Sequence, residues 1–185
     1  DARPFGPLTP VRRGPHAALR ANVMGERVLA REPATQADSD MMAQLAAEGV
    51  KAGALGFSTS RTINHKTKRG ELIPTLQAEE AELTTIGKAL GDLGAGWLQV
   101  ISDFDNPSAE FAMLRRITAA SGRKMAITIL QRDAKPEEWR QITGWIAEAN
   151  AAGVGMLGQV LTRATGILLG FEISQNPFFG RPSYM

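Results

Sequence analysis

Amphipathic stretches alternate along this chain with short apolar runs, and this alternation is the feature that most constrains the fold. Apolar residues recur at helical spacing in four stretches, at 36–51, 78–93, 107–121 and 136–150. A short apolar run follows each of these stretches, at 54–58, 97–101, 125–130 and 154–161. The pattern predicts four helices, each followed by a strand.

Residues with helix-start and helix-stop preferences support this division. Thr35 followed by Asp38 has the spacing of a capping box, which predicts a helix start at 36. Asn106 followed by Pro107 predicts another start, because asparagine caps helices and proline suits the first helical position. Gly122 then predicts the end of that helix. Capping residues close in the sequence therefore predict these helix boundaries.

The strands indicate an α/β fold. Strands that are apolar throughout are expected to be buried on both faces, and helices that connect them imply parallel strands and right-handed crossovers. A closed eight-unit barrel needs about 250 residues, so four units in 185 residues correspond to a partial, TIM-barrel-like layer or to a small open sheet. We expect residues 14–170 to form this domain, between irregular segments at 1–13 and 171–185.

Composition narrows the classes of function. The chain has 21 basic and 19 acidic residues, and the basic residues are scattered, so nucleic acid is not an expected partner. No run of about 20 apolar residues is present, and no signal peptide is apparent, which predicts a cytoplasmic protein without a membrane partner. The absence of cysteine excludes disulfides and thiolate zinc sites.

Polar side chains cluster where the expected strands end. Since the carboxyl ends of parallel strands meet at one edge, we expect these side chains to surround one site. A turn or a solvated surface explains the same residues equally well. The candidates are Ser58, Thr59, Ser60, Arg61, His65, Lys66, Asp103, Asp133 and Arg163.

Nucleotide and metal motifs are weak in this sequence. Gly91, Gly94 and Gly96 follow a helix, whereas a dinucleotide-binding fingerprint follows a strand. His16 and His65 are far apart in the sequence, and neither has a second histidine at ligand spacing. We expect His16 to make a structural hydrogen bond. His65 is the stronger candidate for chemistry, because the cations around it would favour a neutral imidazole.

Four segments carry a family resemblance: PHAALR at 15–20, VMG at 23–25, REPAT at 31–35 and AGALGFSTS at 52–60. Looser matches continue at 64–67 (NHKT), 100–104 (VISDF) and 176–178 (NPF). In order and spacing, these segments resemble the N-acyl-D-amino-acid deacylase (D-aminoacylase) family of the amidohydrolase superfamily. The likeness is specific over residues 14–61.

The resemblance implies a metal-dependent barrel that hydrolyses an amide, with zinc or another divalent metal as cofactor. In that family, a His-x-His pair on the first strand and an aspartate on the last strand bind metal. Neither segment is present here, so the resemblance implies a middle fragment of a longer enzyme. Two further histidines of the family are replaced by Ser102-Asp103 and by 131–133 (QRD). A divergent branch, a shifted alignment or a loss of hydrolysis would each explain these replacements.

The positions of the candidate residues at the expected strand ends, together with the resemblance, indicate their roles. His65 and Asp103 are predicted to be catalytic, and no metal ligand is assigned. Arg61 is expected to grip a substrate carboxylate through a two-pronged contact. The predicted substrate-binding residues are Ser58, Thr59, Ser60, Arg61, Lys66 and Arg163.

Three functions therefore remain open at this point. The first is hydrolysis of the C–N amide bond of an N-acyl-D-amino acid or a similar small-molecule amide. The second is a non-catalytic, ligand-binding relative that has lost its metal ligands. The third is an open α/β layer that forms homo-oligomers through its unpaired sheet edges.

Overall fold

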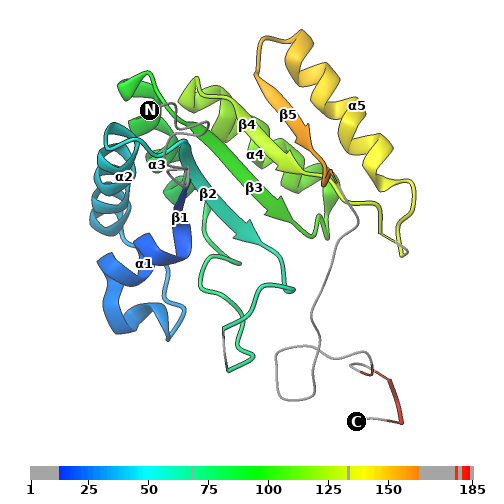
Figure 1. Ribbon diagram of the computed structural model, residues 1–185, viewed down its shortest axis with the longest axis horizontal. Coiled ribbons are helices and arrows are strands. Elements are labelled where there is room, and N and C mark those ends of the chain that lie inside the picture. Colours follow the sequence, from blue (N-terminus) through cyan, green and yellow to red (C-terminus); the bar gives the residue numbers. More distant parts are fainter. Residues whose placement is uncertain (1–12, 68, 133, 163–177, 179–180, 184–185) are drawn as a thin grey trace, which may run out of the picture.

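The computed structural model describes residues 13–67, 69–132, 134–162, 178 and 181–183. Its centre is a five-stranded sheet in which every neighbouring pair is parallel (Figure 1). The strand order follows the chain: β1 (Arg13–Pro15), β2 (Gly56–Arg61), β3 (Trp97–Ser102), β4 (Met125–Thr128) and β5 (Met156–Gln159). Doubly wound sheets reverse direction at a switch point, so this sequential order is the one expected of barrel strands.

Helices connect the strands and pack against one another in chain order, α2 on α3, α3 on α4 and α4 on α5. The helical elements are α1 (His16–Met24), the 3₁₀ helix η1 (Gly25–Val28), α2 (Gln36–Lys51), α3 (Glu80–Leu93), α4 (Pro107–Ser121) and α5 (Glu138–Ala151). The α/β class, the four helices and the parallel strands predicted from the sequence are thereby confirmed.

The core lies between the sheet and this layer of helices. Leu98, Val100 and Ile127 are almost fully buried, together with residues of α3 and α4 such as Leu90 and Leu114. Burial of these side chains is the main stabilising contribution to the layer. The core is therefore continuous from α2 to α5.

The second face of the sheet is more open than the sequence predicted. Trp97 is 37% exposed and Leu157 is 44% exposed, although both lie in strands. Burial alternates along β3, where Leu98 and Val100 are buried and Gln99 and Ile101 are only half-buried. The expectation of burial on both faces is wrong for β3 and β5, because the described helices cover one face. It holds for β4, where the consecutive residues Met125, Ala126 and Ile127 are all buried.

Local capping explains where two of the described helices, α2 and α4, begin. The Thr35 side chain accepts a hydrogen bond from the Asp38 backbone, and the Asp38 side chain accepts one from the Thr35 backbone, which confirms the capping box. A hydrogen bond from Arg27 lowers the pKa of Asp38 to about 2. Asn106 likewise caps α4, with Pro107 at its first position. These boundaries agree with the sequence prediction.

The first strand and the first helix were not predicted. β1 has only three residues, so it carries no apolar run to detect. In α1, the buried side chains include the polar residues His16 and Arg20, and no side chain caps its start. Periodicity in apolar residues cannot find a helix whose buried face is charged.

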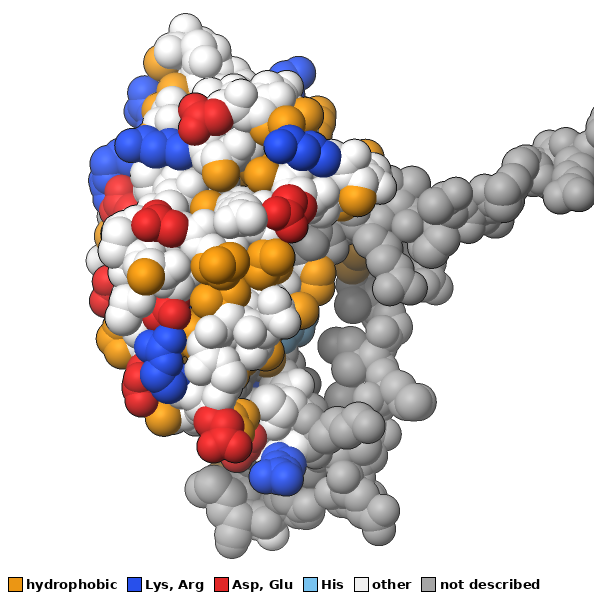
Figure 2. All heavy atoms as spheres, turned by 90° about the vertical axis from the view of Figure 1, so that its left-hand side faces the viewer, with side chains coloured by type: hydrophobic (Ala, Val, Ile, Leu, Met, Phe, Trp, Pro, Cys, Tyr) orange, Lys and Arg blue, Asp and Glu red, His pale blue; other side chains and the backbone are white. Residues whose placement is uncertain are grey.

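The outer face of the molecule carries charges of both signs. Figure 2 views the side on which α2 lies, where basic and acidic side chains are interspersed around a central group of apolar ones. This distribution lacks the continuous basic stripe typical of nucleic-acid-binding surfaces. Among the described helices, none has the length and apolar character needed to cross a bilayer.

Two helical glycines allow a test of how closely α3 packs on α4. A Cβ added to Gly91 would lie 2.1 Å from the Ser121 carbonyl oxygen, whereas a Cβ on Gly49 in α2 would meet nothing within 4 Å. We expect Gly91→Ala to lower the free energy of unfolding by about 1–3 kcal/mol through overpacking. Gly49→Ala should raise it by up to about 1 kcal/mol, because alanine favours helix. Urea denaturation followed by circular dichroism measures both, and equal effects would contradict the close packing.

Candidate active site

The ends of three neighbouring strands open into one cavity, as the parallel order requires. It has a volume of about 390 Å³. Residues that follow β2, β3 and β4 meet here, together with the start of α5. The lining includes Thr62, His65, Ser102, Asp103, Thr128, Arg132 and Glu138. Side chains more than 60 residues apart in the chain therefore share one wall, so these three strand ends meet at one cavity, as expected from parallel strands.

A second cavity, of about 310 Å³, adjoins the first. It lies over β2 and is lined by Ser58, Ser60 and Gln99, among others. His65 and Ile101 line both cavities, so the two spaces share a wall. The two cavities lie side by side at the carboxyl ends of the strands, and we call them together the strand-end site.

Consecutive residues of β2 serve different purposes, because side chains alternate between the faces of a strand. Ser58 and Ser60 are half-buried and line the cavity over β2. Thr59 is buried, and its hydroxyl lies 2.9 Å from Nδ1 of His16. Arg61 points to the helices. All four residues were predicted to bind the substrate. Thr59 also lines the cavity over β2, but only the two serines have side chains without a structural partner in the helix layer.

Ser60 and His65 form the closest pair of reactive groups in the strand-end site. The Ser60 hydroxyl lies 2.6 Å from Nδ1 of His65. The His65 side chain is exposed, so its other nitrogen remains accessible from the cavities. A histidine next to a hydroxyl in an open pocket can accept or deliver a proton.

Asp103 ties the loop after β2 to the end of β3. Its Oδ1 accepts a hydrogen bond of 2.6 Å from the Thr62 hydroxyl, and its Oδ2 accepts one of 2.7 Å from the Ile63 backbone N–H. The loop that carries His65 is thus held directly by this carboxylate. Asp103 lines the cavity as predicted, and both of its oxygens have structural partners.

Arg61 is engaged in a structural ion pair. Its Nε lies 2.6 Å from Oε1 of Glu110, its Nη2 lies 3.2 Å from Oε2, and its Nη1 donates to the Ala78 carbonyl at 2.7 Å. The bidentate contact joins β2 to α4. These bonds occupy the guanidinium and disfavour the predicted contact between Arg61 and a substrate carboxylate.

The remaining predicted residues lie at the edge of the site or outside it. The backbone of Lys66 forms a short antiparallel bridge with Leu72, which folds the β2–α3 loop back on itself. Lys66 is half-buried and lines neither cavity of the strand-end site. Arg163 and Asp133 lie outside the described residues.

A buried ionic cluster lies behind β2 and was not predicted in full. Nε2 of His16 lies 2.6 Å from Oε1 of Glu82, and Nη1 of Arg20 lies 2.6 Å from Oε2 of the same carboxylate. All three side chains are at most 3% exposed. The structural hydrogen bonds expected of His16 are present. Glu82 was missed, because it is 66 residues from His16 in the sequence.

Burial decides the protonation state of His16. Desolvation lowers its pKa, and this effect exceeds the opposing hydrogen bond and charge of Glu82. The neutral imidazole carries its proton on Nε2, because a carboxylate oxygen only accepts hydrogen bonds. Nδ1 must then accept a hydrogen bond from Thr59. The cluster therefore fixes α1, β2 and α3 relative to one another.

The described residues do not fit a metal centre by themselves. No group of three or more histidine, aspartate or glutamate side chains in the described part of the chain is arranged to hold a metal ion. His65 and Asp103 line one cavity, but two side chains fall short of the three protein ligands of a catalytic zinc site. A metal bound here would need ligands from elsewhere.

The Asp103 tie can be tested by removing its carboxylate. Asp103→Ala leaves the buried Thr62 hydroxyl and the Ile63 amide without their acceptor, so we expect the free energy of unfolding to fall by about 1–3 kcal/mol. Amide exchange at Ile63 should become faster. Asp105→Ala is the matched control, because this exposed neighbour accepts no hydrogen bond in the described structure. Unchanged exchange at Ile63 would show that Asp103 does not hold the loop.

The lowered pKa of His16 predicts a pH dependence of stability. Below its ordinary value of 6.5, the unfolded chain takes up a proton that the folded chain excludes until its lower pKa is reached. The free energy of unfolding should therefore fall as the pH drops below 6.5, by at most about 1.4 kcal/mol per pH unit. His16→Gln should remove this contribution to the slope, whereas His65→Gln should retain it. Urea titrations between pH 5 and 7.5 compare the three proteins, and equal slopes would contradict the assignment.

Two solved structures resemble this fold. One was determined in a study of the binuclear metal centre of D-aminoacylase, and the other is a D-aminoacylase variant, with an aspartate changed to alanine, in complex with copper chloride. Each has a TM-score of 0.64 and 19% sequence identity to this chain. The matches cover 80% and 82% of this chain but only 29% and 30% of the two D-aminoacylase chains. The likeness confirms the partial-barrel fold.

The family comparison covers almost the whole sequence. No curated protein matches the chain. The amidohydrolase family matches residues 6–181, a stretch that includes every element of the sheet and helix layer described above. The chain therefore belongs to the amidohydrolase family.

Proposed function

We propose that the protein hydrolyses the C–N amide bond of an N-acyl-D-amino acid or a similar amide in the strand-end site. The observation that carries this proposal is the pairing of His65 with Ser60 in cavities built by the carboxyl ends of β2, β3 and β4. Barrel enzymes place their chemistry at this edge. Membership of the amidohydrolase family supports the reaction class.

His65 is the proton-transfer group in this proposal. In amide hydrolysis, the oxygen of water adds to the carbonyl carbon, the C–N bond breaks, and the departing nitrogen gains a proton. An accessible imidazole can take the proton from water and pass it to nitrogen. The 2.6 Å contact with Ser60 orients the ring for this transfer.

Ser58 and Ser60 are proposed to bind the substrate. Both line the cavity over β2, and a hydroxyl can donate to a carbonyl oxygen or accept from an amide N–H. Asp103 supports the same chemistry by fixing the His65 loop, and its side chain also lines the adjoining cavity. Its proposed contribution is positioning, because its oxygens are bonded to Thr62 and Ile63.

A divalent metal, with zinc as the first candidate, is proposed as the cofactor of the complete protein. Support comes from the binuclear metal centre named for D-aminoacylase and from the sequence resemblance. Such an ion polarises a carbonyl and supplies a hydroxide at neutral pH. Because the described side chains cannot hold it alone, its ligands would belong to other segments. The chain spans less than a third of the two D-aminoacylase structures.

The proposal is tested with the complete protein and paired N-acetyl-D- and N-acetyl-L-amino acids. We expect amine release from the D-substrates, measured by chromatography, and loss of release after chelation of metal. His65→Gln should lower kcat by about 10²-fold or more, the usual contribution of a general acid or base. Ser60→Ala should lower kcat/KM by a smaller factor.

Ser108→Ala serves as the matched control, since this exposed serine on α4 lies outside the strand-end site. Its kinetics should equal those of the wild type. If His65→Gln also retained wild-type kcat, the assigned role of His65 would be wrong. Binding of N-acyl amino acids without any amine release by the wild type would favour the non-catalytic relative.

A further inference from the structure

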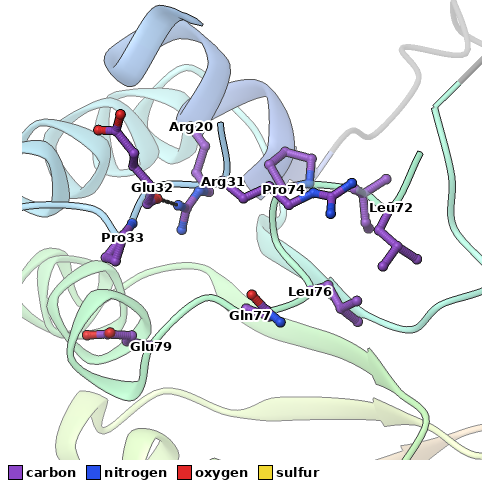
Figure 3. A pocket seen from close by; sticks show the side chains of 10 residues that line it. Arg20, Arg31, Glu32, Pro33, Leu72, Pro74, Leu76, Gln77 and Glu79 are labelled. Atoms are coloured by element: carbon purple, nitrogen blue, oxygen red, sulfur yellow. Dashed lines mark hydrogen bonds between the residues drawn. The ribbon is translucent and has the colours of Figure 1, made fainter. Parts of the chain in front are cut away.

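A third cavity extends the strand-end site outward, between the connection from η1 to α2 and the loop from β2 to α3 (Figure 3). Its volume is about 290 Å³. Ile73 lines both this cavity and the one over β2, so the two cavities are neighbours. We call this space the distal cavity. It lies on the same edge of the sheet as the site of the proposed reaction.

The distal cavity has an apolar lining and a cationic rim. Leu72, Ile73, Pro74 and Leu76 come from one loop, and Pro33 faces them from the other. In Figure 3, the Arg31 side chain runs past Pro74 toward Leu72. Its aliphatic part is therefore close to apolar side chains, and its guanidinium lies at the edge of the space.

The guanidinium of Arg31 makes no hydrogen bond or ion pair with the described residues. Arg132, which lines one of the other two cavities, and Arg61 on β2 are both held in ion pairs. Arg31 differs from them in keeping its donors available. Arg31 is exposed and has a positive φ of 57°, so its backbone lies in the left-handed region.

A second donor in the same wall lacks an acceptor. Arg20 lines the distal cavity and is only 3% exposed. Its Nη1 and Nη2 are bonded to Glu82 and to the Glu32 carbonyl, but its Nε has no acceptor in the described part of the chain. Buried donors are rarely left in this state. The wall thus contains a buried donor without an acceptor as well as the available guanidinium of Arg31.

Two carboxylates also belong to this cavity, those of Glu32 and Glu79. In Figure 3, both carboxylates point away from the Arg31 guanidinium. Oε2 of Glu32 lies 3.9 Å from Nη1 of Arg27, outside the group of lining residues. Recognition of an anion here would therefore depend on directed hydrogen bonds from Arg31 and not on net charge.

We propose that the distal cavity binds a carboxylate of the substrate that is several bonds away from the scissile amide, with Arg31 as the contact residue. Guanidinium groups recognise carboxylates through paired hydrogen bonds. The apolar lining would hold the methylene chain that separates the carboxylate from the amide, and Ile73 would lie beside that chain. This proposal rests on the amide hydrolysis proposed above and specifies its substrate class as acidic at the far end.

The carboxylate can belong to either half of the substrate, and two pairs of substrates distinguish these cases. In the first pair, the acyl group is adipoyl or its neutral 6-amide. In the second pair, the acyl group is acetyl and the amino acid is D-2-aminoadipate or its side-chain amide. Within each pair only the distal charge changes. The pair that responds to Arg31 identifies the half that enters the distal cavity.

The test measures kcat/KM for the complete protein and its Arg31→Gln variant. We expect the variant to lose about 10- to 100-fold on the acidic member of one pair, as removal of a charged hydrogen bond predicts. The neutral member should be hydrolysed equally by both proteins. Arg115→Gln is the control, because Arg115 is an arginine on α4 that lines neither the distal cavity nor the strand-end site.

Binding of free adipate, measured by calorimetry, gives a second readout that does not depend on turnover. Arg31→Gln should weaken it and Arg115→Gln should not. Equal losses on acidic and neutral substrates, or no loss with unchanged adipate binding, would overturn the role of Arg31. Failure of the wild type to hydrolyse any of the four amides would instead count against the proposed reaction, and adipate binding would still report on the distal cavity.

Discussion

Parallel pairing of the five strands is the constraint from which the rest of the molecule follows. Because each strand runs in the same direction as its neighbours, the amino ends of all strands lie on one side of the sheet and their carboxyl ends on the opposite side. The helices must then return the chain across one face, and their apolar sides form the core. The first residues after β2, β3 and β4 precede the helices that cross back over the sheet. Their polar side chains are therefore free to surround the cavities.

Hydrogen bonds from buried or half-buried groups keep these cavities in shape. The β2–α3 loop is held at three points, by Asp103 near its start, by the bond from Thr75 to the Ser60 carbonyl, and by the bond from Arg61 to the Ala78 carbonyl near its end. Behind β2, the buried ionic cluster of His16, Arg20 and Glu82 joins α1 to α3. A loop that supplies both His65 and the apolar lining of the distal cavity is thus fixed along its length. Precise positioning of such groups is what proton transfer requires.

Local signals predicted most of the fold, and distance along the chain limited the rest. The capping box at Thr35 and the Asn106 cap placed two helix starts correctly, because both depend on neighbours within four residues. The common site at the strand ends followed from parallel order. The partners of Arg61 and His16 were out of reach, since Glu110 and Glu82 are 49 and 66 residues away. Arg61 and His16 are therefore recognisable in the sequence as polar candidates, but their structural partners are not.

The alternation within β2 has a consequence for how this sequence can change. Ser58 and Ser60 serve the cavity, while Thr59 and Arg61 anchor the strand to the helix layer. Inserting or deleting one residue between β1 and Ser58 that shifted the strand by a single position would exchange the two sets. The hydroxyls of Ser58 and Ser60 would then face the helices, and the Arg61 guanidinium would enter the cavity without its partner Glu110. A one-residue shift would therefore damage the cavity and the helix contacts together, whereas a substitution at one position changes only one of them.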